Sequence, residues 1–245
     1  NNIHYLWNWH REHPEVKKPK IACRALDWEV WCGLVRSNEL IDWVDYPICI
    51  ADHIKDKLEA EADFKGRLTL IKPGVDLNKW TLSQKKKTAE YKILIPCNEI
   101  DWYLKHVIEG LKIFSILTNK GQDKRYKLHV RGKFKEPEYM QLVIRDFVEK
   151  AGIKDLVTFD QDFIEDMNAY YEQFDCVLNP TMKEAFSFVT AETAAKGIKQ
   201  VLNRWYGAER IWNKDWLYLT PDEAVEMIRN EEYDKNLLRE YVHKW

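Results

Sequence analysis

The sequence predicts an α/β fold, and three observations lead to this expectation. From Tyr91 onward, short apolar runs alternate with longer segments whose apolar residues recur at helical spacing, which is typical of repeated βαβ units. Such units build a parallel sheet that helices cover on both faces. Glycine and proline punctuate the pattern, as at Gly152, Pro180 and Gly197. Residues 81–90 are polar and lack periodicity, so we interpret them as a linker between two parts of the chain.

The first part contains short apolar runs separated by charged segments. Residues 44–50 (VDYPICI) are typical of a buried strand, in which Pro47 favours an edge position or a bulge because proline cannot donate to a sheet. Residues 51–62 follow as a helix, and the segment Lys72-Pro73-Gly74 ends the last strand of this part. The expected strands span residues 3–9, 20–23, 44–50 and 68–71.

The second part has a regular alternation of strand and helix. The expected strands are residues 91–96, 127–130, 157–159, 176–179 and 199–202. The expected helices are residues 104–117, 139–151, 164–173, 188–196, 222–230 and 234–243. In open parallel sheets ligands bind beyond the carboxyl ends of the strands, so we expect a site among the turns that follow the first four strands.

Composition and charge narrow the class of protein. The chain has a formal net charge of -2, so nothing in its charge demands nucleic acid or an anionic membrane as a partner. No run of about 18 apolar residues occurs, so we expect no membrane span, while peripheral membrane contact stays open. The five cysteines are odd in number and widely spaced, which favours a reduced, cytoplasmic protein. They form no CxxC pair, which argues against a zinc site. They are Cys23, Cys32, Cys49, Cys97 and Cys176.

A pair of glutamates carries the strongest functional pattern. Glu184 falls in the turn after the strand at 176–179, and Glu192 falls a little more than one turn into the next helix. Both can therefore face the same crevice at the strand ends. Ser187 is a suitable N-cap for that helix. The amides near Ser187 and Phe188 lack partners within a helix, and such a helix start favours an anionic group, for which a diphosphate is the natural candidate.

Residues 180–197 resemble the E-x7-E signature of a large family of retaining glycosyltransferases that includes sucrose, glycogen and mannosyl transferases. The family commonly reads P-S-x-x-E-G-F-G-x-x-x-x-E-A-x-A-x-G at this point. The chain matches this pattern at Pro180, Glu184, Phe186, Glu192, Ala195 and Gly197. It departs at Ala185 and Ser187, where the family usually has glycine. Other segments resemble family landmarks in the family's order: residues 71–76 (IKPGVD), 128–132 (LHVRG) and 170–180 (YYEQFDCVLNP).

The resemblance implies the GT-B architecture, which has two Rossmann-like α/β domains. The glycine-rich loop that opens the family's first domain is missing, so we expect this domain to be truncated. The expected limits are 1–82 for a partial N-terminal domain on the acceptor side and 83–222 for the domain that binds the nucleotide-sugar donor. Residues 223–245 are then expected to form a C-terminal helix that packs back toward the first domain.

The resemblance also implies the roles of individual residues at the donor site. We expect Glu184 and Lys105 to be catalytic: Glu184 would hold donor-sugar hydroxyls, and Lys105 fits the lysine that grips the diphosphate. Glu192 would bind the ribose hydroxyls. Phe186, Ser187, Phe188 and Arg131 complete the expected donor-binding set.

One family feature is absent from the expected donor site. The arginine that grips the diphosphate in the family is replaced here by Glu99, or by Asn98 with a slip of one residue. A glutamate repels a phosphate, so Arg131, beside Gly132 at the next strand end, is our candidate replacement.

The acceptor side departs further from the family. The family usually carries a histidine at a strand end in the first domain, and the matching stretch, residues 19–31, contains none. Arg24 and Asp27 lie nearest and are our expected acceptor-side residues, with His10, on a different expected strand, as an alternative.

The function that the resemblance implies is transfer of a sugar, with retention, from a nucleoside-diphosphate sugar to a hydroxyl of a glycan, glycolipid or glycoprotein. The resemblance implies that this transfer needs no metal. It also needs no cofactor, because the nucleotide sugar is a co-substrate. Two alternatives stay open. The lost arginine and the short first domain favour a non-catalytic module that binds a nucleotide sugar or a carbohydrate. A glycosyltransferase acting on a modified DNA base is the other, although we do not expect nucleic acid as a partner.

Overall fold

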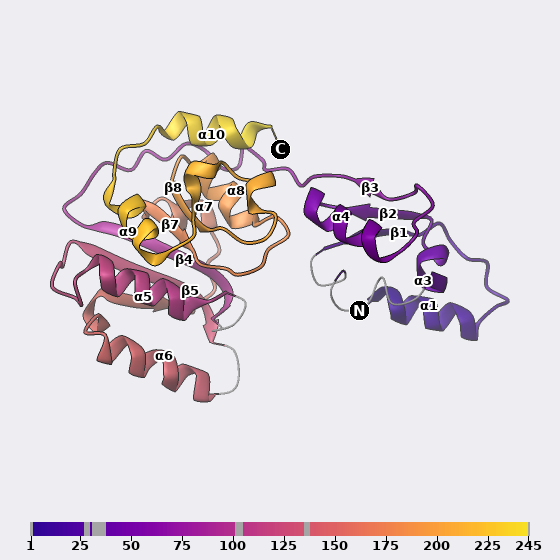
Figure 1. The fold of residues 1–245 in the computed structure, drawn as a ribbon, viewed down its shortest axis with the longest axis horizontal. Coiled ribbons are helices and arrows are strands. Elements are labelled where there is room, and N and C mark those ends of the chain that lie inside the picture. The colour runs from indigo at the N-terminus through magenta and orange to yellow at the C-terminus, as the bar shows by residue number, and fades with distance from the viewer. Residues whose placement is uncertain (1, 27–29, 31–37, 101–104, 135–137, 245) are drawn as a thin grey trace. The chain divides into compact units, whose positions relative to one another are not determined.

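The computed structural model describes residues 2–26, 30, 38–100, 105–134 and 138–244 (Figure 1). Contacts within the chain divide it into two compact units. The first unit comprises Asn1–Gly74 and Glu184–Phe186, and the second comprises Val75–Lys183 and Ser187–Trp245. The expected domains, 1–82, 83–222 and 223–245, stay predictions, because a grouping by contacts does not test which pieces are separate domains.

The first unit is built around three short parallel strands. β1 (Ala22–Ala25), β2 (Tyr46–Cys49) and β3 (Thr69–Leu70) pair in the order β1-β2-β3. The helix α3 (Asn38–Trp43) precedes β2, and α4 (Asp52–Glu61) follows it and buries Ile54 and Leu58. The strand and helix pattern of residues 44–71 is therefore close to the expectation.

Two expectations for the first unit were wrong. Residues 3–9 form part of the helix α1 (Asn2–Glu12) and not a strand. The half-buried residues Ile3, Trp7 and His10 recur at helical spacing, whereas Tyr5 and Trp9 are exposed. Over so few residues, a cluster of apolar and aromatic side chains does not distinguish a helix from a strand.

Pro47 lies in the central strand of the first sheet and not at its edge. It faces Cys23 of β1 in the parallel register. The short strand β3 pairs with β2 only at Ile48 and Cys49, so it begins beyond the proline. A central position is therefore compatible with the missing N–H, because no ladder bond from β3 is required at Pro47.

The second unit contains a six-stranded sheet in which all pairings are parallel. Its order is β6-β5-β4-β7-β8-β9. Five strands lie where the sequence predicted them: β4 (Tyr91–Ile100), β5 (Tyr126–Phe134), β6 (Val157–Asp160), β7 (Cys176–Asn179) and β8 (Lys199–Asn203). The edge strand β9 (Leu217–Tyr218) was not predicted, because two residues carry no periodicity. The expected α/β class with parallel sheets is confirmed.

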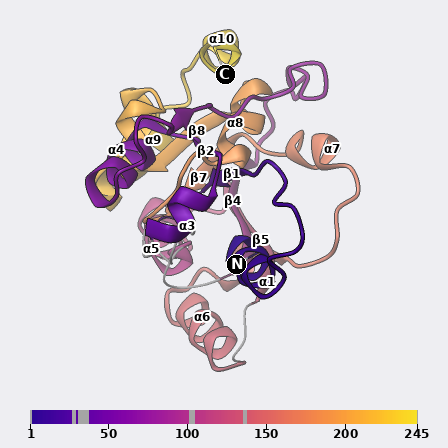
Figure 2. The ribbon, with the colours of Figure 1, turned by 90° about the vertical axis from the view of Figure 1, so that its right-hand side faces the viewer.

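Helices cover both faces of this sheet (Figures 1 and 2). α5 (Val107–Leu117), α6 (Glu138–Lys150) and α9 (Pro221–Arg229) share one hydrophobic core with the sheet, to which the strands contribute Ile93, Ile95, Leu128 and Val130. α8 (Phe188–Ala195) and α10 (Lys235–His243) lie on the other side, with the short helix α7 (Met167–Tyr171). The layered arrangement leaves the carboxyl edge of the strands to the loops.

The segment from Leu77 to Gln84 forms no helix or strand, and α10 fixes its first part. The guanidinium group of Arg239, on α10, donates to the carbonyl oxygens of Leu77 (2.8 Å), Trp80 (2.6 Å) and Ala195 (2.6 Å). Because the last of these ends α8, one side chain joins α10, α8 and the segment.

A buried lysine fixes the remainder of the same segment. Lys196 is 2% exposed, and its ammonium group donates to the Thr81 carbonyl oxygen (3.3 Å) and pairs with Glu172 (2.9 Å). Glu172 in turn accepts hydrogen bonds from the Ser83 hydroxyl (2.8 Å) and the Gln84 amide (2.6 Å). Part of the expected linker is thus bonded into the second unit.

Candidate functional site

The strand order of the second sheet indicates where a ligand binds. Its connections run outward in opposite directions from β4 and β7, which are neighbours at the centre. In open α/β sheets ligands bind at the carboxyl ends of the strands beside such a switch point. The loop that follows β7, residues 180–187, leads directly into α8. The start of α8 therefore lies at the position that the topology favours.

Ser187 occupies the N-cap position of α8, as expected, but without the expected capping bond. Its backbone is left-handed, with φ at 68°, and its hydroxyl group lies 2.8 Å from the Thr190 hydroxyl and 3.3 Å from the Asn179 amide nitrogen. The first helical hydrogen bond runs from the Ala191 amide to the Ser187 carbonyl oxygen (3.2 Å). The amides of Val189 and Thr190, in the first turn, therefore have no partner within the helix and are placed for an anion.

The left-handed backbone of Ser187 gives a testable prediction about stability. A residue other than glycine costs about 1–2 kcal/mol in this conformation, because its Cβ crowds the carbonyl oxygen. We expect Ser187→Gly to be more stable than Ser187→Ala by about this amount, since both lack the hydroxyl and only glycine is unstrained. Urea denaturation of the two variants measures the difference. Equal stabilities would contradict the assigned backbone conformation. The glycine that the family usually has at this position fits the same geometry.

Glu192 lies in α8, as predicted, and contacts α7. Its carboxylate accepts a hydrogen bond from the Tyr171 hydroxyl (3.2 Å). Burial raises the pKa of Glu192, because its charged form is desolvated, and the Tyr171 hydrogen bond and the positive charge of Lys79 only partly offset this effect. Neither Tyr171 nor Lys79 was predicted as a site residue, because the sequence alone does not show which side chains lie near Glu192.

A second group of polar side chains occupies the carboxyl ends of β5 and β6. Arg131 and Asp160 face each other in the strand register. One oxygen of Asp160 accepts hydrogen bonds from His129 Nδ1 (2.9 Å) and from the Tyr170 hydroxyl (2.6 Å). Burial opposes ionisation of Asp160, but these hydrogen bonds and the charge of Arg131 outweigh it, so the pKa of Asp160 is lowered. Only Arg131 of this group was predicted as a site residue.

Glu184 and Phe186 lie in the loop between β7 and α8, as expected, and both belong to the first unit by their contacts. Phe186 is 2% exposed, so its ring is a packing element of this loop. Within the first unit, the Glu184 carbonyl oxygen lies 3.2 Å from Nε2 of His53. His53 is buried in the first turn of α4, directly after β2. This histidine was not predicted as a site residue, although it follows the carboxyl end of a predicted strand.

The other predicted donor residues lie near strand ends and helix starts. Lys105 is half-buried and lies two residues before the start of α5. Asn98 and Glu99 are exposed within β4, where the family would have its arginine. Phe188 is the first residue of α8 and is 47% exposed.

The predicted acceptor-side residues are only partly described. Arg24 is exposed on β1, and Asp27 lies outside the described residues. His10 lies on the helix α1 and not on a strand, and its ring centroid lies 5.9 Å from that of Trp43. His10 is therefore not at a strand end.

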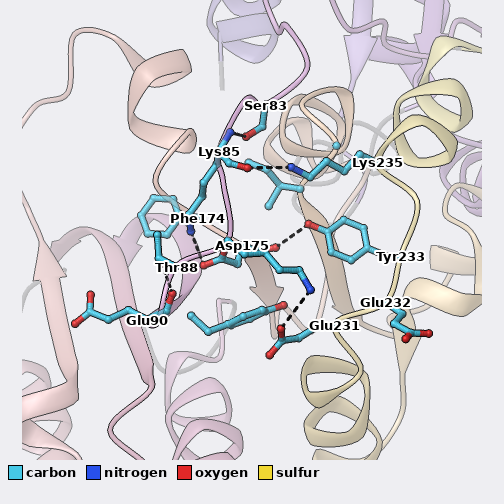
Figure 3. Close-up of a pocket in the computed structure, with 14 residues that line it drawn as sticks. Ser83, Lys85, Thr88, Glu90, Phe174, Asp175, Glu231, Glu232, Tyr233 and Lys235 are labelled. Carbon is cyan, nitrogen blue, oxygen red and sulfur yellow. Dashed lines mark hydrogen bonds and ion pairs between the residues drawn. The ribbon is translucent and has the colours of Figure 1, made fainter.

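A cavity of about 370 Å³ opens at the opposite edge of the second sheet, near the amino ends of β4, β7 and β8 (Figure 3). Two of its lysines pair with acidic side chains that also line it: Lys85 pairs with Asp175, and Lys87 lies 3.8 Å from Glu231. Because ligands of open parallel sheets bind at the carboxyl edge, we place the functional site there and not in this cavity.

The described part of the chain lacks two features. Within it, no three or more His, Cys, Asp or Glu side chains are grouped so that they could hold a metal ion. Among the helices that the structure describes, none has the length and hydropathy of a membrane span.

No protein-family model matches the chain, and no curated protein sequence matches it. Solved structures do resemble it. A glycosyltransferase from Rickettsia africae superposes with a TM-score of 0.68 at 13% identity, covering 85% of this chain and 62% of the other. The lipopolysaccharide outer core galactosyltransferase WaaB has a TM-score of 0.65 at 13% identity, with coverage of 99% and 74%. HepE from Anabaena, solved in complex with UDP, has a TM-score of 0.64 at 12% identity, with coverage of 84% and 65%.

These similarities concern the fold. At such low identities the chain shares with these structures the Rossmann-like α/β architecture with parallel sheets, which confirms the expected GT-B class. The chain spans 62% of the length of the Rickettsia glycosyltransferase.

Proposed function

We propose that the protein is a retaining glycosyltransferase that moves a sugar from a nucleoside-diphosphate sugar to an acceptor hydroxyl without a metal ion. The observation that carries this proposal is the carboxyl edge of the second sheet. There the amides of Val189 and Thr190 lie in the first turn of α8 and have no partner within the helix, and Glu192 of the same helix accepts a hydrogen bond from Tyr171. The fold shared with a glycosyltransferase from Rickettsia africae and with HepE, which was solved in complex with UDP, supports the same assignment.

The proposed chemistry assigns a role to each group. When the bond between the anomeric carbon and the diphosphate breaks, negative charge develops on the phosphate oxygens. The amides at the start of α8 and the ammonium group of Lys105 stabilise that charge. Glu184 holds donor-sugar hydroxyls near the reacting carbon, and Glu192 accepts hydrogen bonds from the ribose.

The acceptor and the compartment are also proposals. A hydroxyl of a glycan, a glycolipid or a glycoprotein is the proposed acceptor, with Arg24 as a contact on the acceptor side. The described cysteines are free and buried, which supports a reducing compartment such as the cytoplasm.

Donor hydrolysis tests this proposal without knowledge of the acceptor. Wild-type protein is expected to bind one class among UDP-, GDP- and ADP-sugars and to release the nucleotide slowly in the presence of water. Lys105→Ala is expected to reduce this release about a hundredfold, the usual effect of losing one group that stabilises a developing oxyanion. Glu184→Ala is expected to lose turnover while it retains UDP binding.

The matched control removes a lysine from the exposed side of α5. Lys112→Ala is expected to keep wild-type turnover, because Lys112 makes only a surface ion pair with Glu109 at 3.7 Å. If Lys105→Ala and Glu184→Ala both keep wild-type turnover, the assigned site is wrong. A product with inverted anomeric configuration would contradict the retaining mechanism.

A binding module without turnover is the second candidate. The exposed Asn98 and Glu99 favour it, because they stand where the family has a phosphate-binding arginine. Tight binding of a nucleotide sugar with no turnover or hydrolysis by wild-type protein distinguishes this function from the enzyme.

A further inference from the structure

Arg131 has an unsatisfied donor at the carboxyl edge of the second sheet. Its Nε atom is buried and has no hydrogen-bond partner among the described residues. Buried side-chain donors in native proteins almost always have a partner, and at a candidate site a ligand atom can supply it. Arg131 shares its face of β5 with Lys127 and His129, because side chains alternate along a strand.

The strand order places Arg131 away from the proposed diphosphate position. The start of α8 follows β7, and β4 separates β7 from β5. Neighbouring strands lie about 4.8 Å apart, so Arg131 is about two strand spacings from the strand that leads into α8. The carboxylate of Asp160, ionised because of its lowered pKa, faces Arg131 and would repel a phosphate. This position is therefore unsuited to the diphosphate.

The position is suited to the base of the same nucleotide. In a nucleoside diphosphate the ribose separates the base from the phosphates. If the phosphates lie at the start of α8 and the ribose lies at Glu192, the base extends past Tyr171. Tyr171 donates to Glu192, and the preceding residue, Tyr170, donates to Asp160. Asp160 faces Arg131 in the strand register, so these contacts lead from Glu192 to Arg131.

We propose that Arg131 reads the nucleobase of the donor by donating hydrogen bonds to a keto oxygen, so that uracil is preferred over cytosine and guanine over adenine. This inference rests on the proposed function. Arginine is only a donor, and it makes bidentate contacts with the acceptor edge of guanine. Cytosine and adenine carry an amino group, also a donor, where uracil and guanine carry the oxygen. Asp160 supplies an acceptor beside Arg131 for a ring N–H.

Titration calorimetry with UDP, CDP, GDP and ADP tests the proposal. Wild-type protein is expected to bind UDP more tightly than CDP, and GDP more tightly than ADP. Arg131→Met is expected to weaken binding of the keto-base nucleotides about tenfold to a hundredfold. The ratios of affinity for UDP over CDP and for GDP over ADP are then expected to fall toward one. Arg131→Lys retains the charge but loses the planar fork, so it is also expected to lose the preference.

A matched control and a phosphate series separate the possible outcomes. Lys127→Met removes a positive charge from the same face of β5 at its other end and is expected to leave binding unchanged. If the loss in Arg131→Met is absent for uridine and grows from UMP to UDP, Arg131 contacts phosphate and the inference is overturned. Equal affinities of wild type and Arg131→Met for UDP would overturn it as well. Failure of wild-type protein to bind any nucleotide would overturn the proposed function together with it.

Discussion

Arg239→Met is expected to lower the free energy of unfolding by about 3 kcal/mol or more. Arg239 donates to three backbone carbonyl oxygens, those of Leu77, Trp80 and Ala195, at 2.6–2.8 Å. Hydrogen bonds that involve a charged group contribute about 1.5–3 kcal/mol each, and carbonyl groups left without partners add a penalty. Methionine retains much of the aliphatic side chain, so the loss reports the guanidinium contacts. Urea denaturation followed by circular dichroism measures the change.

Arg204→Met is the matched control. Arg204 pairs with Glu209 on the surface, where its side chain is 50% exposed. Surface ion pairs contribute about 0–1 kcal/mol, so this variant is expected to unfold close to the wild type. Equal stabilities of the two variants would show that the Arg239 contacts contribute little.

The second large effect is expected at Glu192. Glu192→Ala is expected to weaken UDP binding about a hundredfold, because an ionised carboxylate accepts hydrogen bonds from both ribose hydroxyls at about 1.5–3 kcal/mol each. Titration calorimetry measures the affinity. Glu226→Ala, which removes an exposed glutamate from α9, is the control and is expected to bind UDP as the wild type does.

The raised pKa of Glu192 adds a pH dependence with a defined sign. As the pH falls through the raised pKa, Glu192 becomes protonated and loses acceptor capacity, so UDP binding of the wild type is expected to weaken. Glu192→Gln removes this titration and is expected to show a weaker affinity without that pH step. The raised pKa of Glu192 affects the free energy of unfolding in the opposite direction, because the folded state holds the proton more tightly than the unfolded chain does. This contribution to stability is therefore largest at low pH and is lost as the pH rises through the folded pKa.

Local signals in the sequence predicted much of the second unit. Pro180 ends β7, and Gly197 follows α8 with φ at 70°, so the strand and helix that carry the site have clear limits. The positions of Ser187 at the start of α8 and Glu192 inside it followed from these limits. The helix α1 was missed because its aromatic residues do not distinguish the two kinds of secondary structure.

Contacts between side chains from different strands and helices could not be predicted from the sequence. His129, Asp160 and Tyr170 come from β5, β6 and α7 and meet at a single carboxylate oxygen. Nothing in the spacing of these residues shows that they touch, because their contacts depend on the strand register and on where α7 packs. Ser187 was expected to cap α8 with its hydroxyl, but its left-handed backbone directs that hydroxyl toward Thr190 and Asn179.

The contacts of Arg239 and Lys196 bear on how the second unit should be excised for expression. A recombinant fragment that begins at residue 83, the limit expected from sequence, would lack the Leu77 and Trp80 carbonyl groups that Arg239 binds and the Thr81 carbonyl group that Lys196 binds. Both cations would lose these backbone acceptors and depend on water in their place. A fragment that starts at Val75, where the second unit begins, keeps the bonds and is the better starting point for cloning.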